Sequence, residues 1–302
     1  MDKPKISGFT FVRNGITFGY PFVQSIQSLL PVVDELIVVV GDSTDGTREA
    51  IGKINDKKIR IVDTVWDENL RKSGKIFAQQ SNLGLQHTTG DWAFHLQVDE
   101  VLHETAAEKI LHFINLADKR EDVDGLLFPF QHFWGDFKHI HNTRRTHRLE
   151  IRAFKNTKKV FSYKDSQGFR KYSSKEAYDS GEAGEKLRVL NTEVSVFHYS
   201  HSRHPALMKK KSNYFHRFWH DDKWLKEKTN EQLFDFNEVD KLEMFTGQHP
   251  SYMKDVIAAQ DWDFSYDPSQ SNMKMKDKLL NGFEEIFGYR LFEYRNYKLV
   301  KP

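Results

Sequence analysis

The feature that most constrains the fold is the run Leu36-Ile37-Val38-Val39-Val40, five aliphatic residues directly before a glycine. Strands that are buried on both faces of a parallel sheet have this composition, whereas half-buried strands alternate apolar and polar residues. Further strand signals recur through the first 130 residues. We predict strands at 6–12, 36–40, 59–62, 92–98 and 125–130.

Helix signals separate these strands. Pro21 suits a first helical turn, and apolar residues follow it at helical spacing. The pattern Thr105-Ala106-Ala107-Glu108 resembles a capping box. Further helices are predicted at 48–54, 79–86 and 105–116. This βαβα order predicts an α/β protein with a Rossmann-like, mostly parallel, doubly wound sheet.

The pattern changes after residue 130. Further strands are predicted at 147–154, 160–163 and 194–199. The polar stretch 173–185 is expected to be a mobile loop. Helices are predicted at 205–219, 250–260 and 275–287, the last ending at Gly288. We therefore predict a domain over residues 1–204 and a helical C-terminal extension over 205–302 packed on it.

The composition excludes several classes of protein. The 302 residues carry a net charge of +2, which gives no reason to expect a polyanionic partner, and no nucleic-acid motif accompanies the basic residues. Without cysteine there are no disulfides and no thiol chemistry. We see no signal-peptide core and no apolar run near the ~20 residues of a membrane span. A cytoplasmic protein is expected. For Lys209-Lys210-Lys211 we favour a solvated surface, with peripheral contact to the inner face of the cell membrane as the alternative.

Two adjacent acids, Asp99 and Glu100, end the apolar run 92–98. Open α/β sheets bind ligands beyond the carboxyl ends of their strands. Hard oxygen ligands at that place suit Mg²⁺ or Mn²⁺, which could bridge to a diphosphate. The alternative is a solvated strand end whose acids cap the following helix.

A second polar loop, Gly41-Asp42-Ser43-Thr44-Asp45-Gly46-Thr47, follows the aliphatic run. Its glycines permit tight turns, and its Asp, Ser and Thr side chains can cap a helix or bind a ligand. The loop is a plausible cradle for a nucleoside, although a purely structural turn would have a similar sequence.

Taken in order, four segments resemble glycosyltransferase family 2. Residues 9–14 are similar to its opening strand and turn, and residues 42–47 to its Ser-Thr-Asp-Gly-Thr loop. Ser81-Asn82-Leu83-Gly84 resembles its Asn-x-Gly helix, and Gln97-Val98-Asp99-Glu100 its Asp-x-Asp-Glu motif. The order and spacing hold over roughly the first 105 residues. The resemblance implies the A-type glycosyltransferase fold.

The resemblance also implies binding residues. Asp99 is expected to hold Mn²⁺ or Mg²⁺, and His198, late in the chain, is its expected second ligand or a structural histidine. Lys75, beside Arg71 and Lys72, is expected to face the diphosphate or the base. The full set expected to bind the nucleotide sugar is Val12, Arg13, Asn14, Asp42, Asp45, Lys75, Gln79, Asn82, Gln97 and Val98.

Two acids are the catalytic candidates, Asp165 and Glu100. Asp165 follows the short strand 160–163 and precedes Gly168, which combines a firm anchor with access to a cleft. The alternative is a turn aspartate that bonds its own backbone. Glu150 and Asp136 would replace Asp165 if it is not the base.

The resemblance implies a metal-dependent, inverting, hexosyltransferase-like enzyme. It would move a sugar from a nucleotide-diphospho-sugar donor to a hydroxyl of a glycan or lipid-linked acceptor, in bacterial surface polysaccharide synthesis. Gln97 in place of an acid, and Gly15 where an acid often stands, make a noncatalytic nucleotide-sugar-binding relative the first alternative. A histidine-rich metal hydrolase, using His201 and His204, is the second.

Overall fold

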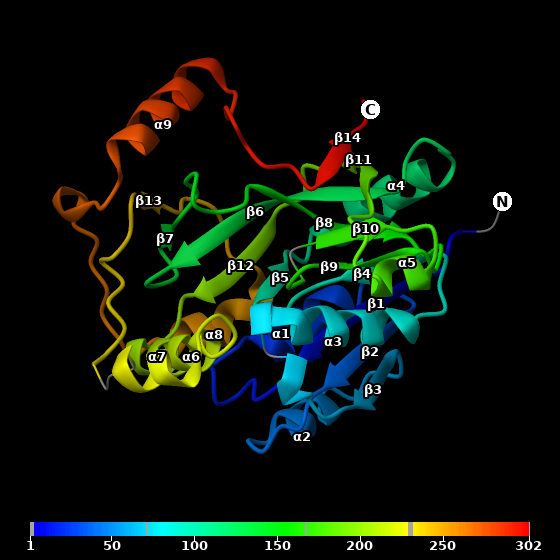
Figure 1. The fold of residues 1–302 in the computed structure, drawn as a ribbon, viewed down its shortest axis with the longest axis horizontal. Helices are drawn as coiled ribbons and strands as arrows, with labels where there is room; N and C mark the ends of the chain where they lie inside the picture. Colours follow the sequence, from blue (N-terminus) through cyan, green and yellow to red (C-terminus); the bar gives the residue numbers. More distant parts are fainter. Residues whose placement is uncertain (1–2, 71, 167, 229–231, 302) are drawn as a thin grey trace.

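The computed structural model describes residues 3–70, 72–166, 168–228 and 232–301. Four parallel strands form one half of its sheet, in the spatial order β3-β2-β1-β4 (Figure 1). They are β1 (Ile6–Val12), β2 (Glu35–Val40), β3 (Ile59–Asp63) and β4 (Trp92–His95). Five of the six residues of β2 are buried, as its aliphatic composition predicts. The predicted parallel α/β core is confirmed.

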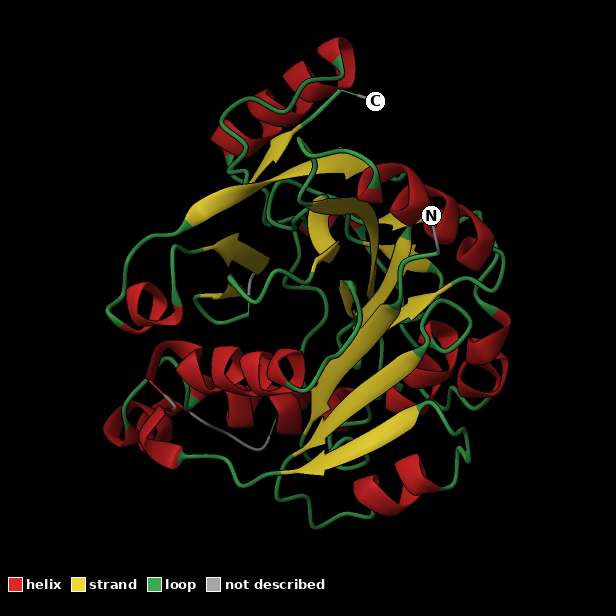
Figure 2. Cartoon of the chain, turned by 90° about the vertical axis from the view of Figure 1, so that its right-hand side faces the viewer, coloured by secondary structure: helices red, strands yellow, loops and turns green. Residues whose placement is uncertain are grey.

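Helices connect these strands and lie along both faces of the sheet (Figure 2). They are α1 (Phe22–Leu29), α2 (Thr47–Gly52), α3 (Lys75–Gln86) and α4 (Ala106–Asp118). The predicted capping box is wrong, because Thr105 makes no side-chain cap; its hydroxyl lies 2.8 Å from His103 Nδ1 instead.

Beyond β4 the sheet becomes mixed. β8 (Leu149–Lys155) lies antiparallel between β4 and β6 (Gly125–Trp134), and the order continues to β11, β10 and β9. The other strands here are β5 (Glu100–Leu102), β7 (His139–Ile140), β9 (Val160–Tyr163), β10 (Gly168–Lys171), β11 (Glu185–Asn191) and β12 (Val196–His201). The segments that follow β9 and β12 extend toward the ends of the parallel strands, where the site forms.

The polar stretch 173–185 is not simply a loop, so that prediction is wrong. It contains α5 (Lys175–Asp179), whose first turn is capped by the Ser174 hydroxyl. Tyr178 from this helix stacks on Phe161 of β9 with ring centroids 4.7 Å apart. A few apolar contacts therefore order a segment whose composition is mostly polar.

The C-terminal residues supply helices and also rejoin the sheet. The helices are α6 (Pro205–His216), α7 (Asp222–Lys228), α8 (Lys254–Ala258) and α9 (Met275–Phe287), the last ending at Gly288 as predicted. Short 3-10 turns lie at Glu68–Leu70, Lys72–Gly74, Ser251–Met253 and Pro268–Gln270. β13 (Glu243–Met244) pairs with β7, and β14 (Tyr297–Leu299) pairs with β11. The boundary after residue 204 stays a prediction.

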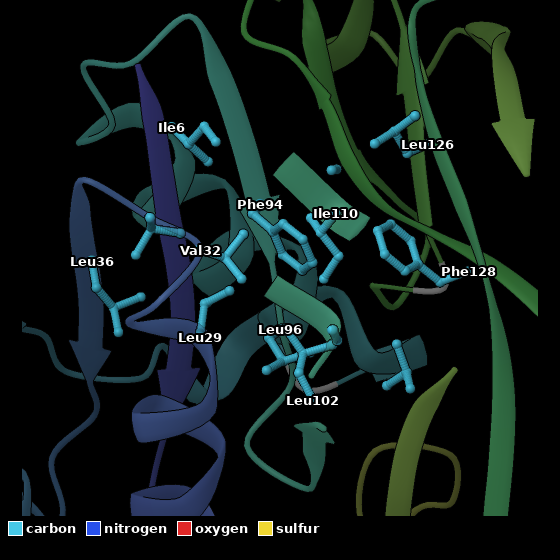
Figure 3. Close-up of a cluster of buried hydrophobic side chains, with 14 of the residues drawn as sticks. Ile6, Leu29, Val32, Leu36, Phe94, Leu96, Leu102, Ile110, Leu126 and Phe128 are labelled. Atoms are coloured by element: carbon cyan, nitrogen blue, oxygen red, sulfur yellow. The ribbon is translucent and has the colours of Figure 1, made fainter. Parts of the chain in front are cut away.

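The main core lies between the parallel strands and helices α1 and α4. Figure 3 shows Ile6, Leu29, Phe94 and Ile110 converging there, each no more than 1% exposed. The burial of each such side chain contributes roughly 1.5–3 kcal/mol to the stability of the folded chain. This packing holds the strands in place. Within the described ranges, no helix combines the length and apolar character needed to span a bilayer.

Candidate active site

A cavity of about 290 Å³, here called the central pocket, lies at the carboxyl ends of β1 and β4. Its wall is formed by Phe11, Val12, Arg13, Phe18, Tyr20, Trp66, Phe77, Gln97, Val98, Asp99, Asp165, Ser166, His198, Ser200, Lys211, Tyr214, Phe215 and Trp219. The pocket therefore lies where open α/β sheets bind their ligands, beyond the carboxyl ends of the strands.

Seven of the predicted site residues meet in this pocket: Val12, Arg13, Gln97, Val98, Asp99, Asp165 and His198. Four segments bring them together, namely the end of β1, the turn after β4, the loop after β9, and β12.

Aromatic rings form one wall. Phe77 of α3 stacks on Phe215 of α6, with centroids 5.5 Å apart, and meets Trp66 edge-on at 5.7 Å. Arg13 lies over the Trp66 ring at 5.3 Å. Flat rings at a strand end offer a stacking surface for a base. The sequence patterns missed Trp66 and Phe77 because isolated aromatic residues are typical of a hydrophobic core.

Asp42 does not line the central pocket but fixes a residue that does. Its Oδ2 accepts a hydrogen bond of 2.7 Å from Arg13, and its Oδ1 accepts one of 3.2 Å from the Trp66 backbone. Asp42 therefore positions the Arg13 guanidinium and the Trp66 ring of the aromatic wall. Its predicted contact with a nucleotide base stays a prediction.

Asn14 and Asp45 join the two loops that follow β1 and β2. Asn14 Oδ1 accepts a hydrogen bond of 3.1 Å from Thr44, and Asp45 Oδ2 accepts one of 2.7 Å from Thr17. A Cβ on Gly15 would lie 2.7 Å from Phe22, so the neighbouring turn has no room for the acid found in the family pattern.

Lys75, Gln79 and Asn82 line a different cavity, of about 810 Å³. Asn82 is buried, donates to the Tyr178 hydroxyl at 2.8 Å, and accepts from the Ser162 backbone at 2.8 Å. The structure does not bring these three residues to the central pocket, and their part in nucleotide-sugar binding stays a prediction. Lys72 is exposed, and Arg71 lies outside the described residues.

Asp99 is 7% exposed and lies among three basic side chains. Its Oδ1 lies 3.6 Å from His198 Nε2, and its Oδ2 lies 3.5 Å from Lys211 Nζ and 3.9 Å from Arg203. Burial alone would raise the pKa of Asp99, but these neighbours hold that pKa well below its usual range. The carboxylate is therefore charged at neutral pH.

A chain of histidines orients His198. The ring of His132 lies 2.7 Å from the His147 carbonyl through Nε2, which must donate because a carbonyl only accepts. Burial lowers the pKa of His132 to about 3, so its Nδ1 carries a lone pair. That atom lies 2.8 Å from His198 Nδ1, which must donate. His198 therefore presents Nε2 toward Asp99.

The residues around Asp99 fit a divalent cation bound together with a diphosphate. Asp99 Oδ1 and His198 Nε2 could both ligate one ion, and Mg²⁺ in particular is usually held by one or two carboxylates together with substrate phosphates. No group of three or more His, Asp or Glu side chains suited to holding a metal alone occurs in the part of the chain that is described.

Lys211 is not a solvated surface residue, and the prediction for it is wrong. It is 8% exposed, and its amine also bonds to the Ser200 carbonyl at 3.0 Å. Burial lowers the pKa of this amine to about 7, although Asp99 opposes the shift. Its neighbour Lys210 is exposed. Only one lysine of the basic run faces the pocket, and its sequence context gave no signal of that.

Asp165 lies in a strained loop at the edge of the central pocket. Both neighbours, Lys164 and Ser166, have left-handed backbones, with φ of 55° and 69°. Such strain costs of order 1–3 kcal/mol and gathers at functional sites. Asp165 Oδ1 has no hydrogen-bond partner among the described residues, and burial raises the pKa of the carboxyl group.

Glu100, the second catalytic candidate, points away from the central pocket. It is fully buried and binds Arg152 through two hydrogen bonds of 2.6 and 2.8 Å. This pairing is structural in character, so the geometry gives Glu100 no access to a substrate in the central pocket.

The two reserve candidates for the base differ in access. Asp136 Oδ1 accepts from the backbones of Lys138 and His139 in a turn outside the central pocket. Glu150 lies in the wall of a neighbouring cavity, and burial raises its pKa to about 7. Among the acids considered, only Asp165 reaches both cavities.

The hydrolase alternative rests on His201 and His204. His201 stacks on Trp134 at 4.3 Å, and His204 accepts from the Ala206 backbone at the start of α6. Both make structural contacts, so the hydrolase alternative finds no support in the geometry.

The sheet order and the pocket at its strand ends agree with the predicted A-type glycosyltransferase fold. The model of the family named Glycosyl transferase family 2 matches residues 21–177, which is more than half of the chain. The chain therefore belongs to this family. No curated protein matches the sequence.

Several solved structures resemble the chain at low identity. The TarS 1–349 fragment of S. aureus with UDP-GlcNAc is 12% identical, with a TM-score of 0.42 over 70% of this chain and 65% of its own. The mannosyltransferase PcManGT of Pyrobaculum calidifontis, with GDP-Man and Mn²⁺, is 16% identical, with a TM-score of 0.41 over 86% and 69%. Glucosyl-3-phosphoglycerate synthase of Mycobacterium tuberculosis, with Mg²⁺ and UDP, is 16% identical, with a TM-score of 0.34 over 72% and 81%. The chain spans less than two thirds of the TarS fragment.

Proposed function

We propose that this chain is a metal-dependent, inverting glycosyltransferase that binds a nucleotide-diphospho-sugar in the central pocket. The observation that carries the proposal is the convergence of Asp99, His198, Lys211 and Asp165 on one pocket with an aromatic wall. Family membership supplies the reaction class. The assignment to bacterial surface glycans, on the cytoplasmic side of the membrane, rests on the resemblance alone.

The donor would be held through its base and through its diphosphate. The base stacks against the wall of Trp66 and Phe77, and Arg13 lies beside it. Asp99 and His198 would hold Mn²⁺ or Mg²⁺ against the phosphates, where the ion supplies charge stabilisation for the leaving group. The amine of Lys211 lies on the other side of Asp99, 3.5 Å from its Oδ2.

In the transfer step, the acceptor hydroxyl attacks the anomeric carbon from the face opposite the diphosphate. The new glycosidic bond forms as the bond to the diphosphate oxygen breaks, and the electron pair leaves with the nucleoside diphosphate. Asp165 takes the hydroxyl proton, since it lies at the edge of the pocket and its Oδ1 has no hydrogen-bond partner among the described residues. Such proton transfer contributes typically a factor of ~10²–10⁴ to the rate.

The test is a panel of nucleotide diphosphates and nucleotide sugars, each with and without Mn²⁺. We expect at least one diphosphate to raise the unfolding temperature of the chain, more so with Mn²⁺, because a ligand that binds the folded state stabilises it. Its nucleotide sugar should be turned over with an acceptor present. Binding without turnover would favour the noncatalytic relative, and absence of any binding would reject the donor site.

A further inference from the structure

A second cavity, of about 620 Å³, lies beside the central pocket, and we call it the arginine pocket. Its wall contains Arg144, Arg145, Arg148, Arg152 and Arg290. These arginines come from the segment before β8, from β8 and from the segment after α9. Gln97, Asp165 and Ser166 line both pockets. A molecule bound in the arginine pocket would therefore meet the donor at Asp165.

We infer that the arginine pocket binds the sugar acceptor, and that this acceptor carries a phosphate or carboxylate group close to the hydroxyl that receives the sugar. The inference rests on the proposed function, because sugar transfer requires a second substrate beside the donor.

Acids hold the arginines of the wall in place, and Asp240, outside the wall, lies 3.7 Å from Arg145. The five arginines face three acids of the same wall, Glu150, Asp165 and Glu293. Glu284, outside the wall, holds Arg144 at 3.3 Å and Arg290 at 2.9 Å. Guanidinium groups that are already fixed bind phosphate or carboxylate oxygens with little further loss of side-chain freedom.

Arg148 is the arginine best placed to contact a ligand. Its side chain is 40% exposed and its NH2 donates to Glu293 at 3.3 Å. Its Nε is buried and has no hydrogen-bond partner within the described residues. Arg152, by contrast, is neutralised by Glu100.

Two further buried donors in the wall also lack a partner among the described residues, Ser166 Oγ and Asn296 Nδ2. Ser166 is 5% exposed and Asn296 is 7% exposed. Because Arg170 donates to Asn296 Oδ1 at 2.8 Å, the orientation of this amide is fixed and its NH₂ group is the free end. Buried donors without partners are costly, and an oxyanion offers several strong acceptor atoms to satisfy them.

The partnerless acceptor in the same wall is Asp165 Oδ1, where the two pockets meet. The wall thus offers donors around Arg148 and an acceptor at Asp165. An anionic sugar complements both, with its charged group on the donors and its hydroxyl on the carboxylate. A neutral sugar could accept the same hydrogen bonds, but without charge assistance they are roughly half as strong.

The test measures binding of four probes to the full chain by calorimetry: glucose 6-phosphate, glucuronate, inorganic phosphate and glucose. The first two separate a phosphate from a carboxylate as the recognised group. Variants are Arg148→Gln and Asn296→Asp, with Arg48→Gln as control because Arg48 is an exposed arginine that pairs with Asp63 outside both pockets. UDP and GDP binding is measured on the same samples, and thermal unfolding checks that each variant folds.

We expect at least one anionic sugar to bind about tenfold tighter than glucose, since a hydrogen bond to a charged group is worth at least a factor of ten. Arg148→Gln and Asn296→Asp should each remove about that factor, while Arg48→Gln and nucleotide binding stay unchanged. Equal binding of glucose and the anionic sugars, or no loss in Arg148→Gln, would overturn the inference.

Two other outcomes separate this inference from the proposed function. If UDP or GDP binds and no anionic sugar does, the acceptor assignment fails and the donor site stands. If anionic sugars bind and no nucleotide diphosphate does, the proposed function fails, and the acceptor role of the pocket fails with it. Weaker nucleotide binding in Arg148→Gln would assign the arginines to the donor instead and also overturn the inference.

Discussion

The central pocket and the arginine pocket share Asp165 but are built in different ways. Much of the central pocket comes from strand ends and turns of the first hundred residues, where single polar side chains follow buried strands. The arginine pocket joins residues 144–152 to residues 290–297, which are far apart in the chain. Sites at strand ends leave local patterns in a sequence, whereas sites between distant segments do not.

The largest expected effect lies at the boundary of the two pockets. Asp165→Asn keeps the shape of the side chain but removes the proton acceptor. We expect turnover to fall by a factor of ~10²–10⁴ with donor affinity unchanged. Steady-state kinetics with a working acceptor measures this, and Asp179→Asn on the exposed side of α5 is the control. Near-normal turnover would move the role of base to Glu150, inside the arginine pocket.

The second prediction asks whether Glu100, next to Asp99, has a structural or a catalytic role. Glu100→Gln leaves Arg152 buried without its counter-charge, and breaking such a pair costs about 3–5 kcal/mol of the free energy of unfolding. Chemical denaturation measures this loss, with the exposed Glu108→Gln on α4 as control. Unchanged stability together with lost turnover would instead restore Glu100 as a catalytic residue.

How far the sequence predicts the site depends on this same contrast. Asp99 and Arg13 could be found because each follows a buried strand, and the parallel order of the strands brings them to one edge. Lys211 could not be found, since a lysine in a basic run on a helix gives no sign that its amine is buried. Asn82 is predicted from its motif, and in the structure it links α3 to Tyr178 and Ser162 by hydrogen bonds, so its binding role stays a prediction.

Lys211 lines the central pocket but not the arginine pocket, so its removal should affect donor binding alone. Lys211→Met removes the amine beside Asp99 and should weaken nucleotide-diphosphate binding about tenfold to a hundredfold. Lys210→Met, one position earlier and exposed, should change nothing. Equal effects of the two variants in a calorimetric titration would show that Lys211 has no special part in nucleotide binding.

A further effect, small per unit of pH, concerns His95, a fully buried histidine at the end of β4. Burial lowers the pKa of His95 to about 3, against 6.5 for an ordinary histidine. Between these values the unfolded chain takes up a proton that the folded chain does not, so stability is complete above pH 6.5 and falls on acidification. The contribution is up to about 1.4 kcal/mol per pH unit. His95→Phe should flatten the slope of unfolding free energy against pH, and an identical slope would contradict a neutral His95.

The central claim is that the carboxylate of Asp99 organises donor binding in the central pocket. The most direct measurement is the affinity of the preferred nucleotide diphosphate for Asp99→Asn and for the control Asp63→Asn, with and without Mn²⁺. Asp63 ends a neighbouring parallel strand and pairs with Arg48 outside the pocket. We predict that Asp99→Asn loses the Mn²⁺-dependent part of the affinity while folding normally, and that Asp63→Asn keeps it. Equal, Mn²⁺-dependent affinity in both variants would contradict the claim.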